Sequence, residues 1–195
     1  MKNRKEPEGS TPLDLNESLG LIPEISTQDE LNTFEQLNIS QALKWAQKSR
    51  KLKRELLTPS GLFLLHRRMF ANVWIWAGSI RSSEKNIGFS PDQIQMQLKS
   101  ACEDTKYQIE NSVDDLEAIA VRFHHRLTQI HAFPNGNGRH ARLSADLLMT
   151  FNGQRAFSWG AESLKEISDM RDEYIAALRE ADCGDISALV RFAKI

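Results

Sequence analysis

The stretch HAFPNGNGRHAR, residues 131–142, constrains this chain more than any other. Apolar residues recur at helical spacing before it, at Phe123, Leu127 and Ile130, and helical spacing resumes after it. A helix is therefore expected to end near His131, and a second helix to begin near Gly138. The connecting loop contains glycine, asparagine and proline, which predicts a tight turn with accessible backbone amides.

The start of the second helix has the features of an anion-binding site. The first N–H groups of a helix have no partner within it, and the helix dipole adds partial positive charge there. Gly136 and Gly138 have no side chain to block an anion, and Arg139 and Arg142 lie three residues apart on one face. His131, with an ordinary pKa near ~6.5, lies beside them. The pattern predicts a polyphosphate site with a general base at its edge.

Each of these residues taken singly has a structural explanation. Asn-Gly pairs are common in turns, and a single histidine before a turn more often caps a helix than acts as a base. A plain turn does not need a base, an aromatic anchor (Phe133), a glycine-flanked asparagine and two arginines together. We therefore interpret the stretch as a functional site.

The stretch also resembles the signature of Fic domains, the Fic/Doc superfamily, through His131-x-Phe133-x-x-Gly136-Asn137-Gly138-Arg139-x-x-Arg142. The segments LHRRMF at 65–70 and VWIWAG at 73–78 are similar to the region that these domains carry upstream. From about Leu21 to the end, the chain is similar to the subgroup called mobile mystery protein B. The resemblance implies an all-α, Fic-type helical domain with a small β-hairpin flap.

The resemblance further implies a reaction, the transfer of AMP or a related nucleotide monophosphate from ATP onto a serine, threonine or tyrosine hydroxyl of a target protein. His131 would take the proton of the attacking hydroxyl. Arg139 would bind the β- and γ-phosphates, Arg142 would lie at the γ-phosphate, and Phe133 would hold the loop in the core. The expected phosphate-binding set is Asn135, Gly136, Asn137, Gly138, Arg139 and Arg142.

One position departs from the family pattern. Asn135 stands where most active members have an aspartate or glutamate that holds Mg²⁺. An amide oxygen can ligate a hard cation but brings no charge. Asn135 is therefore expected to bind Mg²⁺ weakly, with the metal held mostly by the phosphates of ATP.

The region 78–88 breaks the helical spacing, and in Fic proteins this region is a hairpin flap over the active site. By resemblance, Asn86, Ile87 and Gly88 would hold a segment of the target protein by backbone pairing. A plain connecting loop is the alternative.

One class of Fic proteins carries an inhibitory glutamate on an N-terminal helix, where it pairs with the second motif arginine. Glu35 and Glu30 each match the corresponding motif in part. A solvated glutamate on the helix surface is the alternative for both.

Local signals suggest a flexible or extended arm at residues 1–20 and a single Fic-like domain at residues 21–195. Helix starts are predicted at Thr27 with Glu30 (a capping box), Thr58 with Pro59, Ser90, the segment 112–117, Ser163 with Glu166, and Ile186, and a helix stop at Asn152 with Gly153. The first of these helices is expected to bury Leu31, Phe34, Leu37, Ala42, Trp45 and Ala46.

The composition is that of an ordinary globular protein, with 195 residues, 41% hydrophobic and 26% charged. A formal net charge of −1 gives no whole-surface reason to bind nucleic acid, although residues 44–54 are basic. Two cysteines lack metal-type spacing, and no apolar run or signal core is present, so we expect a cytoplasmic protein without membrane contact.

Two classes of function are compatible with these observations. The first is an enzyme, an AMP transferase or a Doc-like phosphotransferase. The second is a catalytically weak Fic-like binding or regulatory module in a toxin–antitoxin-like pair. In the subgroup the resemblance implies a helix-turn-helix partner protein, and it leaves a homodimer open.

Overall fold

The computed structural model describes residues 13–160 and 167–195, and within these ranges the secondary structure is helical. The helices are α1 (Leu15–Ser18), α2 (Gln28–Lys48), α3 (Arg50–Glu55), α4 (Pro59–Phe70), α5 (Ile94–Glu110), α6 (Leu116–Ile130), α7 (Asn137–Phe151), α8 (Ile167–Asp182) and α9 (Ser187–Ala193). The one β-bridge recorded in the described part of the chain joins Leu21 to Trp74 in antiparallel fashion. The all-α fold predicted from the sequence is confirmed.

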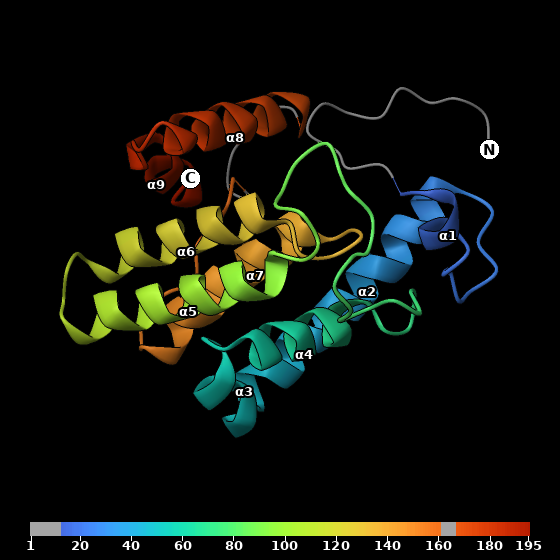
Figure 1. Ribbon diagram of the computed structural model, residues 1–195, viewed down its shortest axis with the longest axis horizontal. Coiled ribbons are helices and arrows are strands. Elements are labelled where there is room, and N and C mark those ends of the chain that lie inside the picture. The colour runs from blue at the N-terminus through green and yellow to red at the C-terminus, as the bar shows by residue number, and fades with distance from the viewer. Residues whose placement is uncertain (1–12, 161–166) are drawn as a thin grey trace.

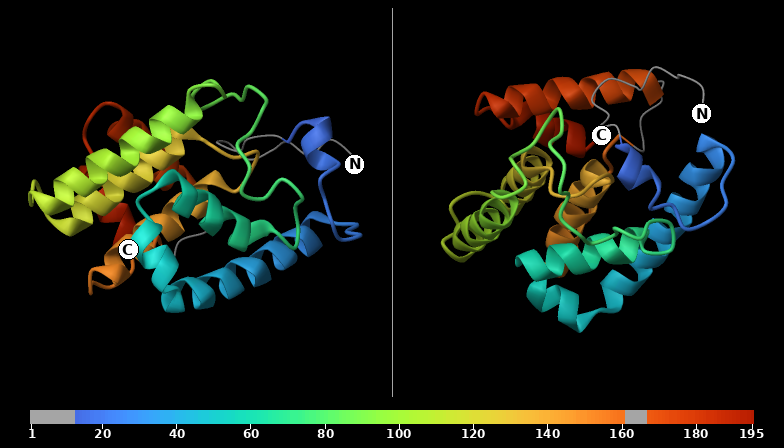
Figure 2. Two further views of the ribbon diagram at one scale, coloured as in Figure 1. Left: turned by 60° about the horizontal axis from the view of Figure 1, so that its bottom comes forward. Right: turned by 45° about the vertical axis from the view of Figure 1, so that its right-hand side comes forward.

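The helices form three groups (Figure 1). α6 packs against both α5 and α7 in the centre, α2 packs along α4 on one side, and α8 packs on α9 on the other. Figure 2 shows the same arrangement from two further directions. The N-terminus of α7 therefore faces α2 and α4 on one side and α8 on the other.

Short capping sequences set several helix boundaries. The Thr27 hydroxyl accepts the Glu30 N–H, and the Glu30 carboxylate accepts the Thr27 N–H in return, which is the predicted capping box. The Thr58 hydroxyl caps α4, whose first residue is Pro59. α7 stops at Asn152, as predicted. These predictions succeed because each cap depends only on residues within one helical turn.

Three predicted boundaries differ or fall outside the described residues. α5 begins at Ile94 rather than at Ser90, because residues 91–93 form a turn in which the Gln93 N–H donates to the Ser90 carbonyl. The second motif helix begins at Asn137, one residue earlier than expected. The predicted cap of Ser163 with Glu166 lies outside the described residues.

The face of α2 that meets the core is not the one that its apolar residues predict. Ala42 and Ala46 are buried as expected, but Phe34 is 45% exposed and Leu37 is 57% exposed. Glu35 and Asn38 are buried in their place. The first half of α2 is therefore oriented by a buried polar contact rather than by its hydrophobic residues.

The main core lies between α4, α5, α6 and α7. Its fully buried side chains include Phe70, Leu98, Phe123, Ile130 and Phe133. Burial of each such side chain stabilises the fold by roughly 1.5–3 kcal/mol. None of the helices in the described ranges is long and apolar enough to cross a membrane. Cys102 is buried and Cys183 is exposed, and both are free thiols.

Candidate active site at the junction of α6 and α7

The loop between α6 and α7 is closed at both ends by left-handed residues. His131 caps the C-terminus of α6 with φ 52°, and its N–H donates to the Leu127 carbonyl. Gly136 precedes α7 with φ 78°, and a Cβ atom there would lie 2.5 Å from the Phe70 ring. Glycine is required at residue 136 on both grounds. The loop therefore holds the His131 side chain close to the start of α7.

Asn137 braces this loop from inside. Its Oδ1 accepts the Phe133 N–H at 2.9 Å, and its Nδ2 donates to the Phe133 carbonyl at 2.7 Å. The Asn137 side chain is 5% exposed, so it has no water to replace these bonds. Its expected contact with phosphate can therefore come only from its backbone N–H.

A fully buried histidine, His66 of α4, packs against the loop and is hydrogen-bonded to it. Its ring stacks on Phe133 with 3.7 Å between centroids. Nδ1 accepts the Gly78 N–H at 2.9 Å, so Nε2 carries the proton and donates to the Asn135 carbonyl at 3.0 Å. In the sequence, His66 is distinguished only as part of the segment LHRRMF at 65–70. A polar residue on the otherwise apolar face of α4 was the available signal.

The first turn of α7 has the open N–H groups that the sequence predicted. The Gly136 N–H donates to Asn135 Oδ1 at 2.6 Å. Among the residues that the structure describes, no acceptor is recorded for the N–H groups of Asn137, Gly138 and Arg139. A Cβ atom on Gly138 would meet nothing closer than the Tyr174 hydroxyl at 4.0 Å. An anion can therefore approach this helix terminus directly.

Both motif arginines flank that terminus, but their contacts differ. Arg139 Nη1 lies 2.5 Å from Glu35 Oε2, and its guanidinium lies over the Phe70 ring. Arg142 lies over the Tyr174 ring, 5.3 Å from its centroid, and Nε donates weakly to the Gly138 carbonyl. Arg142 is thus not engaged by Glu35.

The two candidate inhibitory glutamates are in different places. Glu35 is 4% exposed, and besides Arg139 it holds the Trp74 indole N–H, 2.7 Å from Oε1. Glu30 is exposed, and its carboxylate serves the cap of α2. The arginine that Glu35 contacts is the first of the motif, Arg139, and not the second, because Arg142 lies over Tyr174 on the α8 side of the helix.

His131 is 7% exposed, and its environment keeps the imidazole neutral. Burial, and then the positive charges of Arg81 and Lys85, lower the pKa of His131 to about 4, although a backbone hydrogen bond with Thr128 opposes the shift. At neutral pH the ring therefore has one nitrogen without a proton, as a general base requires.

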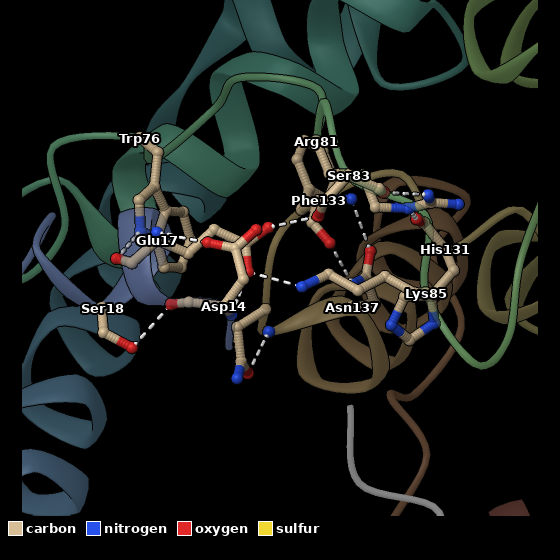
Figure 3. A network of polar contacts seen from close by, with 12 residues as sticks. Asp14, Glu17, Ser18, Trp76, Arg81, Ser83, Lys85, His131, Phe133 and Asn137 are labelled. Carbon is tan, nitrogen blue, oxygen red and sulfur yellow. Dashed lines mark hydrogen bonds and ion pairs between the residues drawn. The ribbon is translucent and has the colours of Figure 1, made fainter. Parts of the chain in front are cut away.

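The segment over His131 does not form the hairpin expected at residues 78–88. Arg81 is 2% exposed and donates to the carbonyls of His131 (2.7 Å), Ser83 (2.7 Å) and Phe89. The Arg81 N–H donates to the Ala132 carbonyl. Within the segment, these bonds satisfy the Arg81 N–H and the Ser83 and Phe89 carbonyls, and the bonds to His131 and Ala132 tie the segment to the motif loop. Figure 3 shows Arg81 reaching toward His131 from this segment.

Of the target-binding residues predicted within this segment, Gly88 lies close to His131. Asn86, Ile87 and Gly88 are exposed, and a Cβ atom on Gly88 would lie 2.7 Å from His131 Cβ. The structure therefore brings Gly88, the last of the three, next to His131.

Comparison with known proteins agrees with this geometry. Residues 56–149 match the family model described as the Fic/DOC family. The chain contains a Fic/DOC domain. The match spans α4, α5, α6 and most of α7, and includes His131, Arg139 and Arg142.

The Fic/DOC domain has relatives among curated proteins. "Protein adenylyltransferase fic-1" of Caenorhabditis elegans is 32% identical over 133 residues, 66% of this chain and 25% of the relative. "Protein adenylyltransferase Fic" of Nematostella vectensis is 26% identical over 163 residues, 81% of this chain and 36% of the relative. The chain thus spans between a quarter and about a third of these relatives' length.

Solved structures share the fold. A fragment of C. elegans Fic-1 superposes with a TM-score of 0.68 and 27% identity, covering 92% of this chain and 52% of that one. BepC of Bartonella tribocorum, solved with bound AMPPNP, superposes with a TM-score of 0.69 and 15% identity, covering 93% of this chain and 97% of that one. The second likeness concerns the fold alone.

The Fic/DOC domain does not provide a metal site from its own side chains. In the described ranges, no cluster of three or more histidine, cysteine, aspartate or glutamate residues is placed to hold an ion. Asn135 Oδ1, the expected metal ligand, accepts the Gly136 N–H. The residues described at this site therefore do not offer the charged oxygen ligands that a resident Mg²⁺ prefers.

Proposed function

We propose that the chain is a nucleotidyltransferase that moves AMP from ATP onto a hydroxyl group of a target protein. The observation that carries the proposal is the position of a neutral His131 beside the open N-terminus of α7. The names of the relatives, protein adenylyltransferases, support the same reaction. The proposed location of the reaction is the cytoplasm, as expected from the sequence.

The proposed chemistry uses this chain's residues in three ways. The target hydroxyl oxygen attacks the α-phosphorus, its proton passes to His131, and pyrophosphate leaves as the bond to the β-phosphate oxygen breaks. The N–H groups of Asn137 and Gly138 hold phosphate oxygens. Arg139 and Arg142 neutralise the β- and γ-phosphates. Catalysis then depends mostly on positioning and charge.

We further propose that Glu35 inhibits this reaction. The Glu35 carboxylate neutralises Arg139 and adds a negative charge where the terminal phosphates would bind. Trp74 holds the other carboxylate oxygen, so Glu35 cannot leave Arg139 without breaking a buried hydrogen bond. ATP binding would require both contacts to open. Glu30, exposed and engaged in the cap of α2, has no part in this proposal.

A binding module with weak or no catalysis is the second candidate. The neutral Asn135 and the closed Glu35–Arg139 pair favour it, because both lower the affinity for Mg²⁺ and ATP. The resemblance to the mobile mystery protein B subgroup supports a helix-turn-helix protein as the partner of such a module. Co-purification of the two proteins would test that pairing.

The experiment that identifies the reaction compares ATP labelled at the α-phosphate with ATP labelled at the γ-phosphate. The purified Glu35→Gly variant, which lacks the proposed inhibitory carboxylate, is incubated with Mg²⁺, cell lysate and each form of ATP, and the same variant carrying His131→Ala serves as control. We expect labelled protein only with α-labelled ATP, and we expect the His131→Ala substitution to abolish this labelling. Label from γ-labelled ATP only would indicate phosphotransfer. No label from either, with ATP still bound, would indicate a binding module.

A further inference from the structure

A buried carboxylate on the N-terminal helix α1 contacts the segment over His131. Glu17 is 9% exposed. Its Oε1 accepts the Ser83 hydroxyl at 2.9 Å, and its Oε2 lies 2.5 Å from Lys85 Nζ. Oε2 also accepts the Asp14 N–H, which completes a capping box for this one-turn helix. Glu17 thus joins two parts of the chain that are 66 and 68 residues apart.

The backbone around Glu17 is anchored independently of its carboxylate. The Trp76 indole N–H donates to the Glu17 carbonyl at 2.9 Å. The Ile75 N–H donates to the Gly20 carbonyl, and the Ile22 N–H donates to the Val73 carbonyl. Residues 17–22 therefore lie along residues 73–76 whether or not the carboxylate is charged. A substitution of the Glu17 side chain can test the carboxylate without releasing the helix.

Lys85 links Glu17 to His131, the proposed base, through its charge. Its side chain is 4% exposed, so the ammonium and the Glu17 carboxylate form a nearly dry ion pair. In Figure 3, Lys85 extends toward Glu17 from the segment that also passes His131. The ammonium is close enough to His131 for its charge to lower the pKa of that imidazole. Lys85 is thus positioned between α1 and the proposed base.

The segment 81–89 is held at two places. At its ends, the N–H groups of Arg81 and Phe89 donate to the carbonyls of Ala132 and Ile130, next to the base. In its middle, Ser83 and Lys85 are held by Glu17. Gly88, which lies beside His131, follows three residues after Lys85.

We propose that Glu17 is a positioning residue for the protein substrate. Through its contacts with Ser83 and Lys85, it fixes residues 82–88 in the position relative to His131 that the acceptor segment of the substrate requires. Residues 13–22 then belong to the acceptor site, although they contact neither nucleotide nor base. This inference rests on the proposed function. A buried ion pair is a weak source of stability but a strong constraint on geometry, which fits a positioning role.

The test compares Glu17→Gln and Lys85→Gln, singly and together, in the Glu35→Gly background. Two products of α-labelled ATP are measured: labelled lysate protein, which needs a positioned acceptor, and free AMP, for which water is the acceptor. We expect protein labelling to fall at least tenfold in each single variant and no further in the double variant. AMP release and the Kd of ATP should change less than twofold. Lys99→Gln, which removes an exposed lysine paired with Glu103, is the matched control.

Backbone order parameters from ¹⁵N relaxation provide a readout that needs no activity. In Glu17→Gln, the order parameters of residues 82–88 should fall, while those of Arg81 and Phe89, whose N–H groups are hydrogen-bonded, should stay unchanged. Unchanged order parameters at residues 82–88 would overturn the inference. So would an equal fall in protein labelling and AMP release, which indicates general damage to the site. If no variant yields any label, the proposed function fails, and the order parameters alone decide whether Glu17 fixes the segment.

Discussion

Glu35 Oε2 of α2 and Arg139 Nη1 of α7 lie 2.5 Å apart, although the two residues are 104 positions apart in the sequence. The Glu35 side chain is 6% exposed and that of Arg139 is 35% exposed, so the contact is shielded mainly on the carboxylate side. One of the two cations at the proposed phosphate site is therefore already neutralised.

Glu35→Gln should tighten ATP binding at least tenfold, a change of about 1.4 kcal/mol in binding free energy. The amide keeps a hydrogen-bond acceptor for Trp74 but removes the charge opposite the phosphates. Titration calorimetry with ATP measures the Kd. Asp29→Asn, an exposed acid on the same helix, is the control and should bind ATP like the wild type. Equal affinities of Glu35→Gln and the wild type would contradict an inhibitory role.

Asn135→Asp should lower the Mg²⁺ concentration needed for half-maximal transfer by about tenfold. An aspartate can still accept the Gly136 N–H, and it adds the charge that a hard cation prefers. The measurement is a Mg²⁺ titration of AMP transfer at fixed ATP. An unchanged midpoint would show that phosphate oxygens alone hold the metal.

His131 should remain neutral at pH values well below the ordinary pKa of a histidine. Burial lowers its pKa from the ordinary histidine value of 6.5 to about 4, so protonation should occur near pH 4. Because the base is the neutral form, lowering the pH from 8 to 5.5 should not remove it. NMR titration of the ring protons, assigned with His131→Ala, measures this pKa directly. Lys85→Gln removes a nearby positive charge and should raise it. A midpoint near 6.5 in the wild type would contradict the buried environment.

The fold should lose stability as the pH falls below about 6.5. Burial lowers the pKa of His66 and His124 well below 6.5, and lowers those of His131 and His140 to about 4. The unfolded chain therefore binds protons that the folded chain does not, and each histidine removes ~1.4 kcal/mol of unfolding free energy per pH unit. This contribution is absent above pH 6.5 and grows as the pH falls toward the folded pKa values.

One carboxyl group opposes this trend. Burial raises the pKa of Asp146 to about 6, so the folded chain binds its proton between about pH 6 and pH 4. In that pH range, Asp146 thus offsets the loss of unfolding free energy per pH unit that one histidine causes. Urea unfolding at pH 7, 6 and 5 should still show a steep fall in unfolding free energy. His140→Gln, which can keep a donor to the Leu62 carbonyl, should reduce the slope by about 1.4 kcal/mol per pH unit.

The helices and the motif loop could be predicted from the sequence because their signals are local. The Thr27 capping box, the Thr58–Pro59 start and the turn after Phe151 each depend on neighbouring residues. The open amides at the start of α7 follow from the glycines beside Asn137. The family resemblance correctly indicated an all-α domain.

The errors concern contacts between residues far apart in the sequence. Phe34 and Leu37 were expected in the core, but the face of α2 that is buried depends on Arg139 and Trp74, which receive Glu35. Periodicity contains no information about such a partner. For the same reason, the sequence did not reveal that hydrogen bonds of Arg81, rather than a hairpin, hold this segment.

The Glu17–Lys85 contact was also beyond sequence reasoning. Residues 1–20 have a polar composition typical of an arm, and a one-turn helix has too few residues for a periodic signal. Only the three-dimensional structure shows that Glu17 is buried against Ser83 and Lys85.

The most direct test of the account compares AMP transfer by Glu35→Gly with transfer by the double variant Glu35→Gly, His131→Ala. Both are incubated with Mg²⁺, lysate and α-labelled ATP, and ATP binding is measured in parallel. We expect Glu35→Gly to label protein at least tenfold faster than the wild type. We expect the double variant to bind ATP as tightly as Glu35→Gly but to transfer no label. Labelling that persists without His131, or labelling that Glu35→Gly leaves unchanged, would contradict the account.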